Sequence, residues 1–144
     1  MWSDTLLAAE RTHLIRLVIW AATSAVLGTG IIATITVRRT VAPILFWFGA
    51  QSLAWGLVEL MITAFGFQGL GMRDVSGATR LDRLTWFIAG LDVGIVVTGV
   101  AVVAVAWMLE RRLAAVGAGL GIIVQGLALL VMNLTFASLL ARLV

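Results

Sequence analysis

Two acidic side chains and one amide lie deep inside long apolar segments of this chain. Glu59 lies seven residues before Gly66, and Asp92 lies eight residues after Leu84. At about 1.5 Å of rise per helical residue, both carboxyls would lie about 10–12 Å below the same membrane surface. Asn133 reaches the same depth from a further segment. Ionisable groups in hydrocarbon are costly and usually functional, so this arrangement predicts binding or exchange of a proton, an ion or a polar ligand.

Four further polar residues are candidates for the same site. Arg16 and Thr23 lie on the first apolar segment, and Gln51 and Gln125 form a second polar layer nearer the middle of the membrane. Hydrogen bonds from Gln and Asn side chains also hold membrane helices together. The two glutamines and Asn133 are therefore better explained as residues that fix helix packing.

Carboxyl groups are not needed for such packing, which makes Glu59 and Asp92 the stronger functional candidates. The alternative is a structural role, in which a carboxyl stays protonated or pairs with Arg16. We expect the two carboxyls to differ, because a single arginine compensates only one of two like charges. Asp92, on the helix that follows the longest loop, is expected to be the better hydrated and more functional of the two.

The remaining composition excludes several kinds of site. The chain has no cysteine and one histidine, His13, so the residues predict no catalytic set, no metal site and no cofactor. The net charge of +3 comes without a basic run interleaved with aromatic residues, which argues against nucleic acid as a partner. Arginines near apolar segments are typical of anchoring at lipid headgroups, so the expected partner is the bilayer.

The elements that carry these residues are transmembrane helices. Hydrophobic residues make up 62% of the 144 residues, and the mean hydropathy is +1.11. About 20 apolar residues cross a hydrocarbon core of about 30 Å. Four segments meet this length, and they leave one longer loop at 68–83, so residues 1–144 are predicted to form a single transmembrane domain. The predicted spans are 14–37, 41–67, 84–109 and 113–140.

The connections predict two helical hairpins. The first two spans and the last two are each joined by a tight turn that contains an arginine pair. Pro43 lies where the second helix would begin, a position at which its missing N–H costs nothing. In the longer loop, the run 79–82 (Thr-Arg-Leu-Asp) has the pattern of a capping box and predicts the start of the third helix there. The predicted fold is an all-α membrane four-helix bundle built from two tandem hairpins.

The two hairpins resemble each other in sequence. Residues 51–60 align with residues 125–134 without a gap, and the alignment places Glu59 opposite Asn133. Each unit has two spans, so the copies would share one orientation in the membrane. The alignment predicts an internal repeat with a pseudo-two-fold axis along the membrane normal.

Two glycine pairs have the spacing of close helix contacts. Gly90 and Gly94 lie on the third span, and Gly117 and Gly121 lie on the fourth. Small residues four apart let helix backbones approach each other. The pairs are consistent with packing inside the bundle, with a homodimer or with a larger membrane complex.

Three segments resemble an uncharacterised family of small four-span bacterial membrane proteins. They are Trp55-Gly-Leu-Val-Glu-Leu60, Gly90-Leu-Asp-Val-Gly94 and the run 122–133. The family pattern is Trp-Asn-Leu-Val-Asn-Leu, Gly-Leu-Asp and Gln-Gly-x-Phe-Leu-Leu-x-x-Asp, and the positions of Asp92 and Gln125 match it. This chain departs from it with Gly56 and Glu59 for the two asparagines and Asn133 for the last aspartate. The resemblance implies the fold and a bacterial membrane location, and it implies no mechanism.

Three functional hypotheses follow. The first is a non-enzymatic accessory subunit that binds a membrane partner or lipid, with the polar layer fixing the helix register. The second is a small oligomeric carrier coupled to protons or ions, in which Glu59 and Asp92 exchange the ion. The third is a membrane-embedded enzyme or cofactor-binding protein, which lacks an evident nucleophile and base.

The arginine distribution predicts the orientation in a bacterial inner membrane. Six arginines lie on the side of the N-terminus and four lie on the other side. Cytoplasmic loops carry the excess of positive residues. We therefore expect both termini in the cytoplasm.

Overall fold

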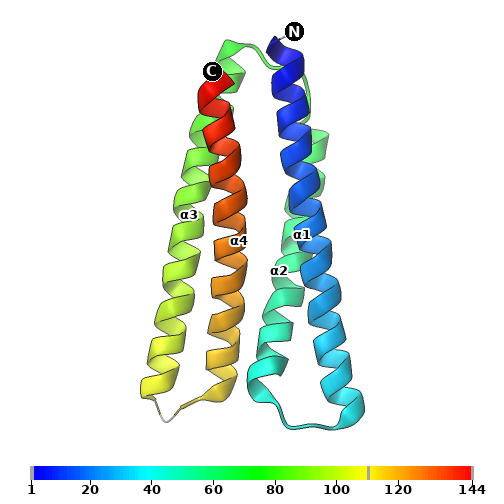
Figure 1. The fold of residues 1–144 in the computed structure, drawn as a ribbon, viewed down its shortest axis with the longest axis vertical. Helices are drawn as coiled ribbons and strands as arrows, with labels where there is room; N and C mark the ends of the chain where they lie inside the picture. The colour runs from blue at the N-terminus through cyan, green and yellow to red at the C-terminus, as the bar shows by residue number, and fades with distance from the viewer. Residues whose placement is uncertain (1, 110, 144) are drawn as a thin grey trace.

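Four long helices make up the structure, a computed structural model that describes residues 2–109 and 111–143 (Figure 1). No strand occurs among these residues, so the all-α prediction is confirmed. All four helices are long and apolar enough to cross a membrane, and the chain is a multi-pass membrane protein. The helices are α1 (Trp2–Arg38), α2 (Pro43–Gln68), α3 (Val75–Met108) and α4 (Leu113–Leu143).

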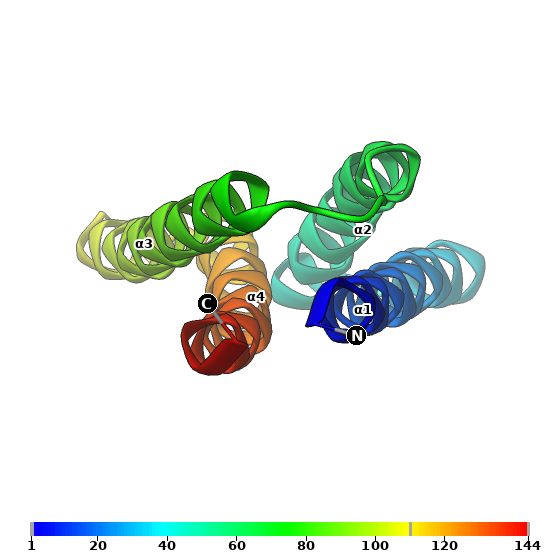
Figure 2. The same ribbon diagram turned by 90° about the horizontal axis from the view of Figure 1, so that it is seen from above.

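The helices pair as two hairpins joined through α4. The main contacts are α1 with α2, α3 with α4, and α4 with both α2 and α1. Seen from above, α4 lies between α3 and the α1–α2 pair (Figure 2). The chain ends lie together at one end of the bundle, here called the terminal end, and the two tight turns lie at the other (Figure 1). The bundle is therefore not closed, because α3 packs mainly against α4 and leaves a side open toward α2.

Helix α3 begins earlier than the sequence predicted. It starts at Val75, and the Asp74 side chain caps it by accepting a hydrogen bond of 2.7 Å from the Gly77 backbone N–H. The predicted capping box at 79–82 is wrong, since those residues are already helical, and the loop predicted at 68–83 shrinks to residues 69–74. Hydropathy missed this first part of α3 because it is polar and extends beyond the hydrocarbon.

The Asp74 cap is expected to make the first turn of α3 sensitive to acid. Hydrogen bonds from the Gly77 N–H and the Ser76 hydroxyl lower the pKa of the Asp74 carboxyl. A carboxyl whose pKa is lower in the folded state stabilises the fold at pH values above its unfolded pKa, about 3.9 for aspartate. This contribution is lost as the pH falls through the folded pKa. Amide exchange of Gly77, corrected for its intrinsic rate, should therefore lose protection in acid. Asp74→Ser should keep protection at every pH because a serine caps without ionising; an acid-dependent loss in that variant would contradict the prediction.

Both tight turns place an arginine in the left-handed region of backbone space. Arg39 follows α1 with φ of 51°, and Arg111 follows α3 with φ of 54°. A residue in this conformation ends a helix and reverses the chain, a role that glycine usually fills. The prediction of two tight hairpin turns is confirmed, and Pro43 opens α2 as expected.

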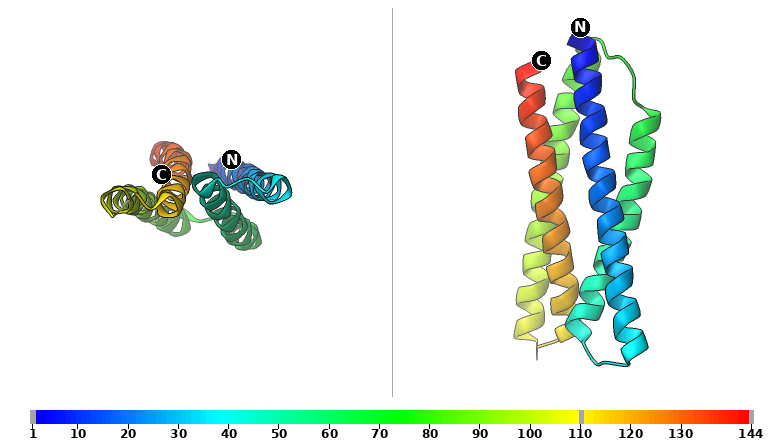
Figure 3. Two further views of the ribbon diagram at one scale, coloured as in Figure 1. Left: turned by 90° about the horizontal axis from the view of Figure 1, so that it is seen from below. Right: turned by 45° about the vertical axis from the view of Figure 1, so that its right-hand side comes forward.

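The longer loop is tied to α1 at the terminal end. The Arg73 guanidinium donates two hydrogen bonds to the Glu10 carboxylate, at 2.6 and 3.0 Å. These bonds, aided by the carboxylate charge, raise the pKa of Arg73. The loop crosses from α2 to α3 beside the start of α1 (Figure 3). A small apolar cluster fills the same end and consists of Leu6, Ala78, Phe136 and Leu140.

Glycines mark the places where helix backbones come closest. A Cβ atom added to Gly56 on α2 would lie 2.6 Å from the carbonyl oxygen of Ala21 and 2.7 Å from the backbone nitrogen of Ala25, both on α1. Gly117 on α4 faces the backbone of Ile44 on α2 in the same way. The predicted packing role of the glycine pair on α4 is confirmed, because Gly121 lies against Gln51. A side chain at Gly56 or Gly117 would push the helices apart.

Candidate intramembrane polar site

One polar residue from each helix meets in the half of the bundle nearer the termini. His13, Glu59, Asp92 and Asn133 are 9%, 5%, 3% and 5% exposed, respectively. We call these four residues the polar cluster. The depth that residue counting assigned to Glu59, Asp92 and Asn133 therefore brings them to one buried region, and each points inward as predicted.

A short hydrogen bond joins α3 and α4 within this cluster. The Asn133 side-chain nitrogen donates to a carboxylate oxygen of Asp92 at 2.6 Å. His13 on α1 lies within hydrogen-bonding reach of Asn133. Its ring stacks on the Phe136 ring with centroids 4.3 Å apart and an interplanar angle of 5°. Asn133 thus joins α4 to α3, and the ring stack next to it brings α1 against α4.

Glu59 differs from its neighbours. Both of its carboxylate oxygens are buried, and neither has a hydrogen-bond partner among the described residues. Asp92 is close enough for the two charges to repel each other. A buried carboxyl without a partner is rare in folded proteins and marks a candidate for proton or ligand binding. Among the described residues Asp92 has a hydrogen-bond partner and Glu59 has none, whereas the expected difference in charge between the two carboxyls stays a prediction.

A second polar layer lies farther from the terminal end. Gln125 on α4 is 1% exposed. Its side-chain oxygen accepts a hydrogen bond of 2.8 Å from the Trp20 indole, and its nitrogen donates one of 3.1 Å to the Ser24 hydroxyl. Gln51 does not join this network: it is half-buried and its stem packs on Gly121. The two glutamines lie on different helix interfaces, so the predicted second layer consists of Gln125 and its partners on α1.

Two predicted site residues lie outside the polar cluster. Arg16 is exposed and makes no ion pair with an acid in the part of the chain that the structure describes. The alternative in which it compensates Glu59 or Asp92 is not realised. The Thr23 hydroxyl donates to the backbone oxygen of Ile19 at 2.7 Å and stays on its own helix.

Sequence reasoning missed the contribution of α1. His13, Trp20 and Ser24 are absent from the site residues that the sequence predicts. The signal was present in the spacing: the buried residues of α1 follow one helix face at intervals of three, four and eight. They are Leu6, Glu10, His13, Ala21, Ser24 and Gly28.

The side chains of the polar cluster are not grouped in space like the ligands of a metal centre. Within the described residues, no group of three or more His, Asp or Glu side chains is placed to hold a metal ion. The contacts instead suit hydrogen bonding and proton exchange between neutral and acidic groups. Glu59 is the member of the cluster whose two carboxylate oxygens have no hydrogen-bond partner among the described residues.

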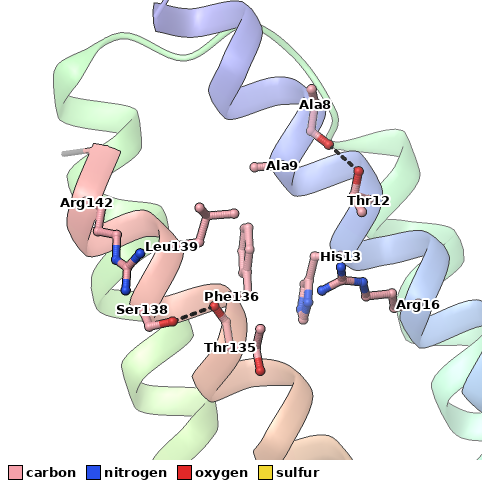
Figure 4. A pocket seen from close by; sticks show the side chains of 10 residues that line it. All are labelled: Ala8, Ala9, Thr12, His13, Arg16, Thr135, Phe136, Ser138, Leu139 and Arg142. Carbon is pink, nitrogen blue, oxygen red and sulfur yellow. Dashed lines mark hydrogen bonds between the residues drawn. The ribbon is translucent and has the colours of Figure 1, made fainter.

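Two surface cavities lie near the cluster but do not include its carboxyls. One, of about 490 Å³, is a groove between α2 and α3. The other, of about 430 Å³, lies between α1 and α4 and includes His13 at its wall (Figure 4). Neither Glu59 nor Asp92 lines either of these two cavities.

The sequence profile of one protein family matches residues 16–134, which cover most of the four helices. It is described as a family of unknown function, DUF6992. No curated protein and no solved structure matches the chain. The predicted resemblance to an uncharacterised family is confirmed, and the match assigns no role to the polar cluster.

Proposed function

This chain belongs to DUF6992, a family of unknown function, and we propose that it is a non-enzymatic accessory subunit that binds a transmembrane helix of a partner protein. The observation that carries the proposal is the glycine pair on α3. A Cβ atom added to Gly90 or to Gly94 would meet nothing within 4 Å. By contrast, the equivalent pair on α4 is covered by α2. The α3 pair offers the same close approach to a helix that this chain does not supply.

The open glycines face a groove between α2 and α3. Trp55 of α2 forms one wall, Gly90, Gly94 and Thr98 of α3 form the other, and Ile122 of α4 lies at the floor. Its lining is apolar apart from Thr98, whose hydroxyl donates to the Gly94 carbonyl oxygen at 2.8 Å. A single apolar helix with small residues at the contact matches this lining and can bring its backbone close to α3.

A helix of a different protein fits this groove better than a second copy of this chain. In a two-fold homodimer each copy presents the same patch to the other. Two identical concave patches touch at their rims and leave the groove unfilled. A convex helix fills it. The buried polar layers then act as the fixed framework, since the hydrogen bonds of Gln125 and Asn133 join α4 to α1 and α3.

Crosslinking from inside the groove tests this proposal. A photoreactive amino acid at Leu91, which lines the groove, should form an adduct with a membrane protein in native membranes. The same group at Ile19, a residue that is 61% exposed on α1, serves as the control position. Gly94→Leu should abolish the Leu91 adduct by filling the groove. Gly30→Leu, at a glycine with equally open surroundings, should leave it unchanged.

Each outcome of the crosslinking is informative. An adduct that survives Gly94→Leu, or one that forms equally from Ile19, would contradict binding in the groove. An adduct that consists only of two copies of this chain would show that the groove binds a second copy instead of a partner protein. Normal helicity and monodispersity of Gly94→Leu in detergent would show that the lost adduct does not reflect misfolding.

A second candidate function is a small carrier coupled to protons, and the unpartnered Glu59 carboxyl favours it. The buried pair of Glu59 with Asp92 supplies two groups that could exchange a proton across a change of shape. In reconstituted vesicles a carrier would move protons, and Glu59→Gln and Asp92→Asn would each stop the flux while the protein stays folded. No flux by the wild-type protein at any pH at which it remains folded would remove this candidate.

We further propose that both termini lie in the cytoplasm of a bacterial inner membrane. Six arginines lie on the terminal side of the chain and four lie on the side of the tight turns, and the excess favours the cytoplasm. The chain has no cysteine, so single cysteines report the orientation directly. An impermeant thiol reagent outside intact cells should label Thr40→Cys and spare Ser76→Cys; the reverse pattern would invert the topology.

A further inference from the structure

The pocket between α1 and α4 has a lining that no role of the polar cluster explains. Arginines from both helices face it, Arg16 from α1 and Arg142 from α4. Figure 4 shows the Arg16 guanidinium directed toward His13 and the Arg142 side chain directed along α4 toward Ser138. The cavity has a volume of about 430 Å³. It lies on a different face of the bundle from the α2–α3 groove.

The positive charge of this pocket is not compensated. Neither Arg16 nor Arg142 forms an ion pair with an acidic residue in the described part of the chain. Glu10 is the acid nearest to His13 along α1, and its carboxylate is already bonded twice to Arg73. No acidic side chain lines the cavity. Two guanidinium groups without an acid partner predict a ligand with negative charge.

The position of the pocket narrows the choice of anion. Arg16 lies two residues inside the predicted hydrocarbon span of α1, and Arg142 lies two residues beyond that of α4. The cavity therefore extends from the lipid headgroups, at Arg142, into the outer part of the hydrocarbon, where Arg16 lies. Guanidinium groups bind phosphate through paired hydrogen bonds. Basic pockets between transmembrane helices are suited to anionic lipid headgroups.

The rest of the lining suits an amphiphile rather than a free ion. Phe136, Leu139 and Ala9 supply apolar surface. The stack of His13 on Phe136 gives the pocket a flat, fixed wall. The hydroxyls of Thr12, Thr135 and Ser138 donate to backbone oxygens of their own helices. The two arginines therefore supply the main free donors, and the apolar wall is left for the glycerol and upper acyl carbons.

From these observations we propose that the α1–α4 pocket binds the phosphate of an anionic phospholipid, held between Arg16 and Arg142. The site is independent of the partner-binding groove, because the two share no residue. The lipid would then link the start of α1 to the end of α4 at the membrane surface.

Titration of the purified protein with defined lipids tests the proposal. Native mass spectrometry in detergent should show more bound short-chain phosphatidylglycerol than phosphatidylcholine. Arg16→Gln and Arg142→Gln should each weaken phosphatidylglycerol binding about tenfold, as expected when a charge-assisted hydrogen bond is lost. The double variant should bind the two lipids equally. The matched control is Arg38→Gln with Arg39→Gln, which removes the same charge at the other end of the bundle.

Other results would overturn the proposal. Equal binding of the two lipids by the wild-type protein would remove the site. Equal loss in the control pair would show a general effect of charge instead of a pocket. Glycerol phosphate that competes as well as phosphatidylglycerol would identify a soluble phosphate ligand in place of a lipid. Circular dichroism of each variant shows whether a loss of binding reflects a loss of fold, and Arg16→Lys, which keeps the charge but not the paired geometry, should retain part of the binding in a folded protein.

Discussion

Replacing Gly56 with leucine is expected to separate α1 from α2 and to abolish the stable fold in detergent. Even a Cβ atom at this position would lie 2.6 Å from the Ala21 carbonyl oxygen. The obstructing atoms belong to backbone, so no side-chain rotation relieves the contact. Overpacking of a well-packed interior costs about 1–3 kcal/mol when side chains yield, and a contact with backbone is expected to cost more. Gly56→Ala should already lower the thermal unfolding temperature, measured by tryptophan fluorescence.

Gly30 on α1 provides the matched control for this prediction. A Cβ atom there would meet nothing within 4 Å. In the interior of a helix, alanine is also more stabilising than glycine by about 0.5–1 kcal/mol. Gly30→Ala should therefore leave the stability unchanged or raise it. Equal loss of stability in Gly30→Ala and Gly56→Ala would show that helix propensity, and not close approach, governs the effect.

Hydropathy predicted the spans but not where the helices end. A scan for apolar residues detects what must lie in hydrocarbon. The N-terminal parts of α1 and α3 carry charged residues and project beyond it, so they escape the scan. At about 1.5 Å per residue, the 37 residues of α1 extend about 55 Å, well beyond a hydrocarbon core of about 30 Å. The sequence signal for the start of α3 is the capping residue Asp74, whose side chain accepts a hydrogen bond from the Gly77 N–H.

Depth along a span was predictable, whereas direction around the helix was less so. Counting residues brought Glu59, Asp92 and Asn133 to one level, and their contacts with Asp92 show that they lie close together. Arg16 lies near that level but on another face of α1, which a depth count does not resolve. The role of His13 becomes visible only when the buried face of α1 is followed along the helix, turn by turn.

Which of the two glycine pairs is covered by a neighbouring helix depends on the arrangement of whole helices. Gly90 and Gly94 have the same spacing as Gly117 and Gly121, and sequence alone treats the two pairs alike. The fold separates them, because α4 lies centrally and α3 lies at the edge. The internal repeat stays a prediction: it relates the hairpins by sequence, while the position of α4 gives its two glycines a neighbour that α3 lacks.

Removing the Asn133 amide is expected to destabilise the bundle, whereas replacing Glu59 with glutamine should not. Asn133→Ala takes away the hydrogen bond to Asp92 and leaves that carboxyl buried without this donor. An unsatisfied buried polar group costs about 1–3 kcal/mol, and more when it is charged. Glu59→Gln keeps the side-chain volume and removes one of two repelling carboxyls, so its stability should equal or exceed that of the wild-type protein.

Reversible unfolding of the purified protein by denaturing detergent, followed by circular dichroism, measures both effects. Thr135→Ala is the control on α4, since its hydroxyl bonds only to the backbone of its own helix, at 2.6 Å, and its loss should change the unfolding free energy by no more than about 0.5 kcal/mol. A wild-type stability for Asn133→Ala would contradict a structural role of the Asn133–Asp92 bond. A marked loss in Glu59→Gln would show that the Glu59 carboxyl has a partner that stabilises the fold. Unchanged or raised stability of Glu59→Gln would instead fit a carboxyl whose role is proton or ligand binding. A buried acid without a hydrogen bond adds nothing to the fold that an amide cannot supply.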